Sequence, residues 1–186
     1  SAALMSVADG TAAAVVTGAG SRWSIGGGLF VGSLDGTGQA SVTVAEGGAL
    51  AIAMGDLGIG AEGTLRIGTG GKAGTVTLDA GVILNEGAIV ADFTDSATLA
   101  MAIDGSGTLT KRGTGTLTLT GAKSYSGGTT VSAGTLQFGN GVSAGSINLA
   151  GGIDVTGGTL AIQAPTILSV AQTVTFGNAT TLSIAA

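Results

Sequence analysis

The chain contains no cysteine, no histidine and a single proline among its 186 residues. Without cysteine, the chain can form no disulfide, no thiolate metal site and no cysteine nucleophile. Without histidine, it lacks the commonest general base and the commonest metal ligand. Only carboxylate, Ser–Lys or Thr chemistry therefore remains available for catalysis.

Charged and aromatic residues are also scarce, at 9% and 3% of the chain. An ordinary globular domain carries about 25% charged residues. The formal net charge is −5, and the six Lys and Arg residues are scattered, so they form no basic face for a nucleic acid. We therefore expect no nucleic-acid partner.

Long apolar runs are absent as well. No run of about 18 apolar residues occurs, so we predict no membrane-spanning helix. The first residues, 1–5, lack the basic start and apolar stretch of a signal peptide. Because the chain does not begin with Met, we expect it to be a segment of a longer protein.

Small aliphatic residues and glycine make up much of what remains. Hydrophobic residues account for 44% of the chain, and 37 residues are glycine. This apolar content is too high for a disordered chain, which could not bury enough surface to offset its ordering entropy. Glycine is expected at frequent turns, where a positive φ costs it little.

A short repeat organises the sequence. Gly-Thr-Leu or Gly-Thr-Val recurs, and each copy opens a stretch in which apolar and polar residues alternate. Period-2 alternation predicts short strands with one buried face. The copies begin at Gly63, Gly74, Gly107, Gly115, Gly134 and Gly158. The same alternation without the signature includes Leu50/Ile52/Met54, Leu99/Met101/Ile103, Ile147/Leu149, Leu168/Val170 and Leu182/Ile184.

Strands this short and this regular favour a β-solenoid, in which each coil pairs with the coils on either side. With roughly 20 to 25 residues per coil, the chain would form about eight coils and a rod on the order of 40 Å long. Threonine on the outer face, as in residues 116–120, would form stacked ladders. No window has the three-and-four spacing of a helix.

Two parts are expected from the repeat pattern. Residues 1–104 form longer units with Gly-Gly pairs, and residues 105–186 begin with tighter, Thr-rich units. Ala88–Ser96 carries Asp92, Phe93 and Asp95 and is interpreted as a loop between them.

The second part contains a dense set of motifs. Gly107-Thr108-Leu109-Thr110-Lys111, Gly115-Thr116-Leu117-Thr118-Leu119-Thr120-Gly121, Tyr125-Ser126-Gly127-Gly128-Thr129-Thr130-Val131 and Ala133-Gly134-Thr135-Leu136 follow one another closely. This run resembles the passenger-associated repeat of autotransporter proteins. Looser segments at residues 18–23, 29–32 and 57–60 resemble repeats of autotransporter adhesins.

The resemblance implies a particular fold and location. It implies an all-β, right-handed parallel β-helix, secreted by a Gram-negative bacterium through the protein's own C-terminal translocator barrel. It also implies display at the cell surface, anchored in the outer membrane through that barrel, which this sequence does not contain. The repeat of such proteins often lies in a folding-promoting region, which residues 105–186 would then represent.

The acidic residues are the first candidates for catalysis. Most stand alone beside glycine, where Asp caps turns, and we interpret them as turn residues. Asp92 and Asp95 are the nearest to a catalytic pair, but a loop explains them equally well. The full set is Asp9, Asp35, Glu46, Asp56, Glu62, Asp79, Glu86, Asp92, Asp95, Asp104 and Asp154.

Nucleotide and calcium sites fit poorly. Residues 68–73 resemble a P-loop, but Ser or Thr is missing after Lys72, and Arg66 stands where the motif needs glycine. The Gly-Gly-x-Gly-x-Asp nonapeptide of calcium-binding rolls is absent. We therefore assign no cofactor and no metal.

Three further features have a bland and a functional interpretation. The threonines at 75/77, 108/110, 116/118, 129 and 130 could form an ice-binding ladder, but their uneven spacing favours an ordinary outer face. Trp23 and Tyr125 could be recognition anchors, although filling a coil corner and covering a turn is the favoured interpretation. Lys111-Arg112 could be a protease site, but a structural role in the repeat is favoured.

The sequence therefore predicts a non-enzymatic, structural segment with no catalytic residue. Its favoured role is the stalk or scaffold of an adhesin or self-associating surface protein, whose partners would be a second copy or a host-surface ligand. One alternative is a folding-promoting segment. Another is the non-catalytic part of a passenger enzyme whose active site lies elsewhere.

Overall fold

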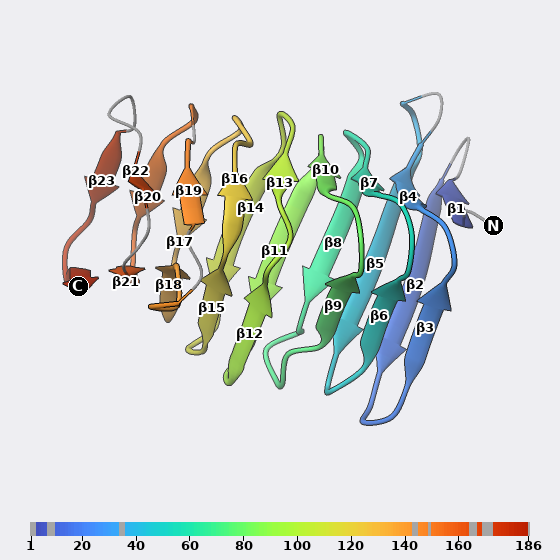
Figure 1. The fold of residues 1–186 in the computed structure, drawn as a ribbon, viewed down its shortest axis with the longest axis horizontal. Helices are drawn as coiled ribbons and strands as arrows, with labels where there is room; N and C mark the ends of the chain where they lie inside the picture. Colours follow the sequence, from blue (N-terminus) through green and yellow to red (C-terminus); the bar gives the residue numbers. More distant parts are fainter. Residues whose placement is uncertain are drawn as a thin grey trace.

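The computed structural model describes residues 3–6, 10–33, 36–142, 145–148, 150–163, 167–168 and 173–185. Within these ranges the chain forms 24 strands and no helix. Every pairing between named strands is parallel. The predicted all-β solenoid is therefore confirmed, and Figure 1 shows it as a row of stacked coils with the termini at opposite ends.

The strands form three faces. The first face contains β1 (Ala3–Ser6), β4 (Leu29–Gly32), β7 (Leu57–Ile59), β10 (Ile83–Asn85), β13 (Ile103–Asp104), β16 (Gly121–Lys123), β19 (Gly145–Ile147) and β22 (Ile167–Leu168). The second contains β2 (Thr11–Thr17), β5 (Gln39–Ala45), β8 (Gly63–Ile67), β11 (Ala88–Asp92), β14 (Thr108–Arg112), β17 (Thr129–Val131), β20 (Ile153–Val155) and β23 (Val174–Phe176).

The third face is split into two sheets. One contains β3 (Arg22–Ile25), β6 (Ala49–Ile52) and β9 (Thr75–Leu78). The other contains β12 (Ser96–Leu99), β15 (Thr116–Leu119), β18 (Thr135–Phe138), β21 (Gly158–Gln163) and β24 (Thr180–Ala185). The first two faces continue across this split without interruption.

Apart from β9 and the last strands β22, β23 and β24, each strand pairs with the third strand further along the chain, so one coil consists of three strands. The described residues make about seven turns of such coils. Coil length varies along the rod: Ala88 pairs with Thr108 in a short coil, whereas Thr11 pairs with Gln39 in a long one. The longest coils therefore exceed the length predicted from the sequence, because their turns are longer while the register of the strands is kept.

The core is a set of apolar columns that run along the rod. Leu57, Ile83 and Ile103 lie opposite one another on three successive coils, and all are fully buried. Alternation within each strand directs these residues inward and their polar neighbours outward. The predicted core positions Leu149 and Val170 lie outside the described residues.

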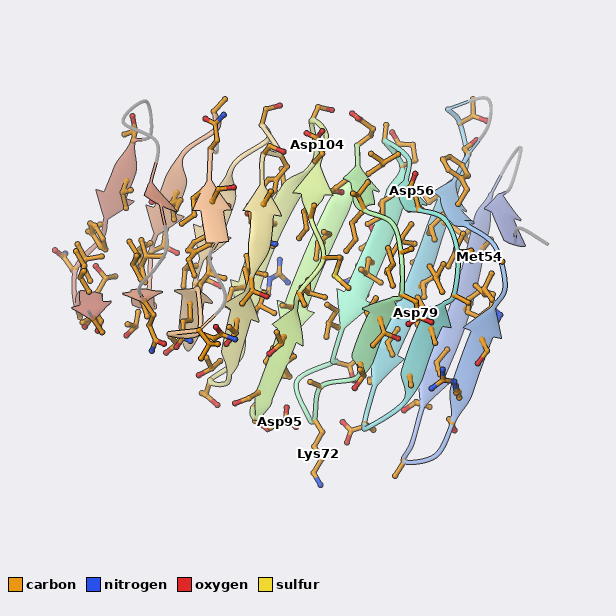
Figure 2. The ribbon with its side chains drawn as sticks, viewed as in Figure 1. Met54, Asp56, Lys72, Asp79, Asp95 and Asp104 are labelled. Carbon is orange, nitrogen blue, oxygen red and sulfur yellow. The ribbon has the colours of Figure 1, made fainter. Side chains whose placement is uncertain are left out.

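Three sequence-based expectations are wrong. Leu182 and Ile184 lie in β24 but are not buried, because no described strand pairs with the outer side of β24. Ala88–Ser96 is not a loop, because Ala88–Asp92 is β11, with Ile89 and Ala91 fully buried. The nearby acidic residues suggested a loop, although Ile89 and Ala91 alternate with Val90 as the inward residues of a strand do. Met54 is not a core residue but lies in the turn after β6, where it is 67% exposed (Figure 2).

Candidate functional site: the polar interior of the repeat coils

Two lysines occupy interior positions that other coils fill with apolar residues. Lys111 lies in a column between Ala91 and Val131, and Lys123 lies between Ile103 and Ile147. Both side chains are buried, with at most 1% of their surface exposed. A lone buried ammonium is costly unless its protons are hydrogen-bonded, so the surrounding groups decide whether the position is tolerated.

Backbone carbonyls surround the Lys111 ammonium. Its Nζ donates to the carbonyl of Arg112 and to that of Gly113, the latter at 2.8 Å. The same Nζ lies 5.0 Å from the centre of the Phe93 ring, within cation–π range. Burial lowers the pKa of Lys111 to about 8, and the nearby Asp92 carboxylate acts in the opposite direction. The lysine thereby fastens the turn that follows β14.

Lys123 fastens the turns of two successive coils. Its Nζ donates to the carbonyls of Met101 at 2.8 Å, Thr120 at 2.5 Å and Ala122 at 3.4 Å. Met101 belongs to the preceding coil, so the ammonium joins two coils. Burial lowers the pKa of Lys123 to about 7. The sequence motifs did not single out this residue, although its place in the column after Ile83 and Ile103 is the signal that could have revealed it.

Tyr125 and Thr129 form a second polar contact inside the same coil. The two hydroxyl oxygens lie 2.6 Å apart, and both side chains are buried. Burial raises the pKa of Tyr125 above its usual value, and the hydrogen bond with Thr129 acts in the opposite direction. A recognition anchor must be exposed, so the fully buried Tyr125 cannot act as one in this fold.

The turn between these two residues requires glycine. A Cβ on Gly127 would lie 2.4 Å from the Ser106 carbonyl oxygen and 2.6 Å from that of Gly107. The coils pack too closely there for any side chain. The Tyr-Ser-Gly-Gly-Thr-Thr motif thus combines a buried hydroxyl pair with a close approach between backbones.

The other predicted recognition and cleavage sites are placed as follows. Trp23 points inward from β3 over Leu50 and is half-buried at the first coil. Lys111 lies inside a paired strand, which argues against cleavage there, whereas Arg112 is exposed.

The acidic residues hold turns together. Glu46, Asp56 and Asp95 each accept a backbone N–H of the neighbouring coil, from Lys72, Val82 and Ala73 respectively. Figure 2 shows Lys72 and Asp95 at one edge of the rod and Asp56 and Asp104 at the opposite edge. Asp9 and Asp35 lie outside the described residues.

Two further acids cap turns of the repeat coils. Asp104 accepts from the Gly105 N–H at 2.8 Å and from the Ser124 hydroxyl at 3.2 Å. Glu86 accepts from both the N–H and the hydroxyl of Ser106. No group of three or more acidic residues that could hold a metal ion occurs within the described ranges.

Residues 68–73 do not form a phosphate cradle. They connect β8 to β9, a strand, whereas a P-loop leads into a helix. The backbone N–H groups of Lys72 and Ala73 donate to the carboxylates of Glu46 and Asp95, so they are engaged in holding the loop.

The predicted threonines do not share one ladder, because Thr110 and Thr130 pair on the second face and Thr129 is buried. Thr116 belongs to a ladder that is regular despite uneven sequence spacing. On the third face the column runs Ser96, Thr116, Thr135, Thr159 and Thr181. The turns absorb the differences in coil length, so uneven intervals in the sequence do not argue against a regular ladder. The neighbouring outward column contains Gln137 and Ala161, so the hydroxyl array is one column wide.

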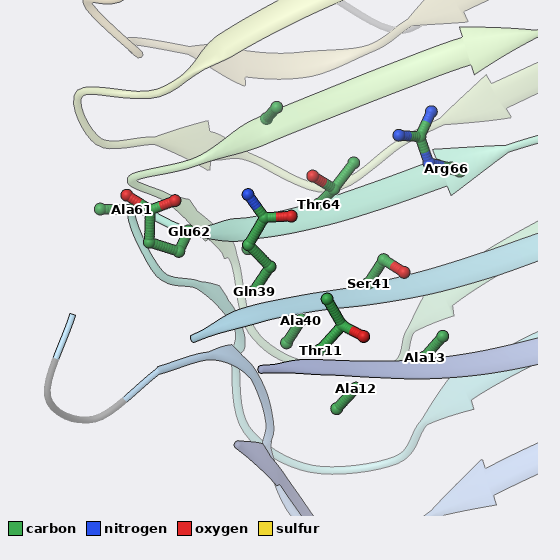
Figure 3. A pocket seen from close by; sticks show the side chains of 12 residues that line it. Thr11, Ala12, Ala13, Gln39, Ala40, Ser41, Ala61, Glu62, Thr64 and Arg66 are labelled. Atoms are coloured by element: carbon green, nitrogen blue, oxygen red, sulfur yellow. The ribbon is translucent and has the colours of Figure 1, made fainter. Parts of the chain in front are cut away.

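A shallow polar trough of about 260 Å³ lies on the outer side of the second face (Figure 3). Gln39 and Glu62 stand at one end and Arg66 at the other, with Ser41 and Thr64 between them. The residues that line it include five alanines and no aromatic residue, so the trough offers hydrogen-bonding groups without an aromatic surface for stacking.

Comparison with known proteins identifies the repeat. The family described as passenger-associated-transport-repeat matches residues 109–138, which span β14 to β18 and include both buried lysines and Tyr125. No curated protein and no solved structure matches the chain. Within the described residues, no helix is long and apolar enough to cross a membrane. The chain thus carries an autotransporter passenger-like repeat within a β-solenoid.

Proposed function

We propose that the chain is a non-catalytic stalk segment of a surface-displayed autotransporter passenger, which carries an adhesive or self-associating protein. The observation that supports this most is the position of the passenger repeat. Residues 109–138 form coils in the middle of the stack, paired on both sides. A stack of this kind is a spacer whose length grows with each coil, by about 4.8 Å.

A non-catalytic role is consistent with how the reactive side chains are used. The sequence lacks histidine and cysteine. Five acids accept hydrogen bonds within turns, and both buried lysines donate to backbone carbonyls. Catalysis would require at least one such group to face a substrate instead. Anchoring in the outer membrane through a translocator barrel is part of the same proposal.

The stalk role is tested on cells that display the full-length passenger. Residues 105–186 are deleted or replaced by the same number of coils from residues 29–104. A stalk predicts that replacement restores cell clumping or host-cell binding, because length matters and the identity of the coils does not. Failure of the replacement, with normal surface display, would contradict the stalk role.

A second candidate, a folding-promoting segment, is favoured by the short coils and lysine-fastened turns of residues 103–138. A short coil, such as the one from Leu109 to Thr129, closes with less loss of chain entropy than the long coil from Thr11 to Gln39, which favours its earlier formation. Lys123→Glu in the full-length passenger should then leave export intact but make coils upstream of residue 83 protease-sensitive. Lys72→Glu, at an exposed loop, is the matched control. Sensitivity restricted to the altered coil would refute the folding role.

A further inference from the structure

The split in the third face leaves two strands with unpaired edges inside the rod. β9 pairs with β6, and β12 pairs with β15, but β9 and β12 do not pair with each other. Their Cα atoms approach within 8 Å, compared with about 4.8 Å between paired strands. Figure 1 shows the two strands apart, with the 68–74 loop beside the gap.

The unpaired backbone groups can be identified from the ladder. The N–H groups of Thr75 and Asp79 donate to the carbonyls of Gly48 and Ile52, on the β6 side. The carbonyls of Asp95 and Leu99 accept from the N–H groups of Thr116 and Thr120, on the β15 side. In a parallel ladder, alternate residues direct both backbone groups to opposite sides. The N–H and C=O groups of Val76, Leu78, Ser96 and Thr98 therefore face the split.

The split also opens the core. The partly buried residues that pack against the core include Ala14, Trp23 and Val174 in the first and last coils, and Leu78, Ala97 and Met101 at the split. A cavity of about 400 Å³ lies there, lined by Leu78 and Met101 and by the outward Thr75, Thr77 and Thr98. Ala97 lies opposite Leu117, in a column whose later members are leucines.

We propose that this split is an acceptor site for an extended peptide strand in which apolar and hydroxyl residues alternate. Only a main chain supplies the alternating donors and acceptors that two strand edges require. Apolar side chains of such a strand would cover Leu78, Ala97 and Met101. Its hydroxyl side chains would continue the outer threonine columns.

The geometry sets a condition on binding. A strand between β9 and β12 needs about 9.6 Å between them, so the split, whose Cα atoms approach within 8 Å, must widen by at least about 1.6 Å. The first two faces are continuous there, through β7–β10 and β8–β11, and can act as the pivot. At one end the coils stay joined by Thr94 N–H to the Gly71 carbonyl and by Ala73 N–H to Asp95, both at 2.8 Å.

Amide hydrogen exchange on the whole chain tests the proposal. The probe is a capped peptide with the sequence of residues 115–121, Gly-Thr-Leu-Thr-Leu-Thr-Gly, at millimolar concentration. The control peptide, Gly-Leu-Leu-Thr-Thr-Thr-Gly, has the same composition without alternation. We expect the first peptide to slow exchange at least tenfold at Val76, Leu78, Ser96 and Thr98, and to leave Thr77 and Ala97, which already face β6 and β15, unchanged. Equal protection by the control, or protection only at the two end coils, would overturn the proposal.

Two substitutions at Thr98 distinguish the contribution of the backbone N–H at the strand edge from that of the side chain. Thr98→Val keeps the backbone N–H, and Thr98→Pro removes it without removing a bond to β15, because that N–H faces the split. Thr98→Val should retain the tenfold protection, and Thr98→Pro should lose it. If Thr98→Pro also lowers the protection of the Leu117 N–H in the absence of peptide, Ala97→Leu is used as the blocked variant instead. Its larger side chain fills the opening. Unaltered protection in both blocked variants would refute the acceptor site.

Discussion

Lys123 gives the fold a dependence on pH that can be measured as stability. Its pKa is about 7 in the folded chain, against 10.5 for an exposed lysine. Between these values the unfolded chain holds a proton that the folded chain has released. The cost of burying the charge is therefore present below pH 7 and disappears as the pH rises toward 10.5.

The size of the effect follows from the shift. Each pH unit between the two pKa values is worth about 1.4 kcal/mol, so Lys123 should raise the free energy of unfolding by roughly 4 kcal/mol over the three units from pH 7 to pH 10. Lys111, with a pKa of about 8, acts in the same direction. Tyr125 acts oppositely, because its raised pKa gives stability that is lost above about pH 10. We therefore expect maximal stability near pH 10.

Urea unfolding at pH 7, 8, 9 and 10 measures this dependence in the original chain, in Lys123→Met and in the exposed control Lys72→Met. Methionine fills a similar volume without a charge. The original chain and the control should share the rise, and Lys123→Met should lose about 4 kcal/mol of it. A flat profile in the original chain, or an unchanged slope in Lys123→Met, would refute the buried ammonium.

Other substitutions probe the remaining parts of the repeat. Tyr125→Phe leaves the Thr129 hydroxyl without its partner and should lower the free energy of unfolding in urea by about 1 to 2 kcal/mol. Adding Thr129→Val should recover part of this loss. If the losses of the two single variants simply add in the double variant, the hydrogen bond is refuted. Gly127→Ala should cost more than about 3 kcal/mol, because its Cβ would lie 2.4 Å from the Ser106 carbonyl oxygen. Gly70→Ala, where nothing lies within 4 Å, should cost only about 1 kcal/mol for its positive φ; equal losses would contradict the close packing.

The solenoid could be predicted from the sequence because its signals are local. Alternation at Leu117/Leu119 and Leu136/Phe138 marks inward strands directly, and glycine marks the turns. The split between β9 and β12 could not be predicted, because both strands alternate normally and only their mutual spacing differs. β11 was missed because Asp92 and Asp95, which closely follow the inward Ile89 and Ala91, are typical of a loop.

The candidate site was only partly predictable. The resemblance to the passenger-associated repeat located the repeat and predicted a structural role for Lys111. In the structure, the Lys111 side chain is buried inside the coil. The burial of Lys123 depends on its register with Ile103 and Ile147, and the two coils that set this register differ in length. Because charged residues are usually exposed, reasoning from residue type alone places Lys123 on the outer face.

The passenger repeat encloses lysine ammonium groups within the column of the solenoid, and this burial can be measured directly. Carbon-13 NMR of lysine side chains, titrated from pH 5 to pH 11, is the most direct test, with Lys123→Met and Lys111→Met to assign the signals. We predict that Lys123 titrates near pH 7 and Lys111 near pH 8. Titration of both near the ordinary 10.5 would place them at the surface and contradict the register of the coils.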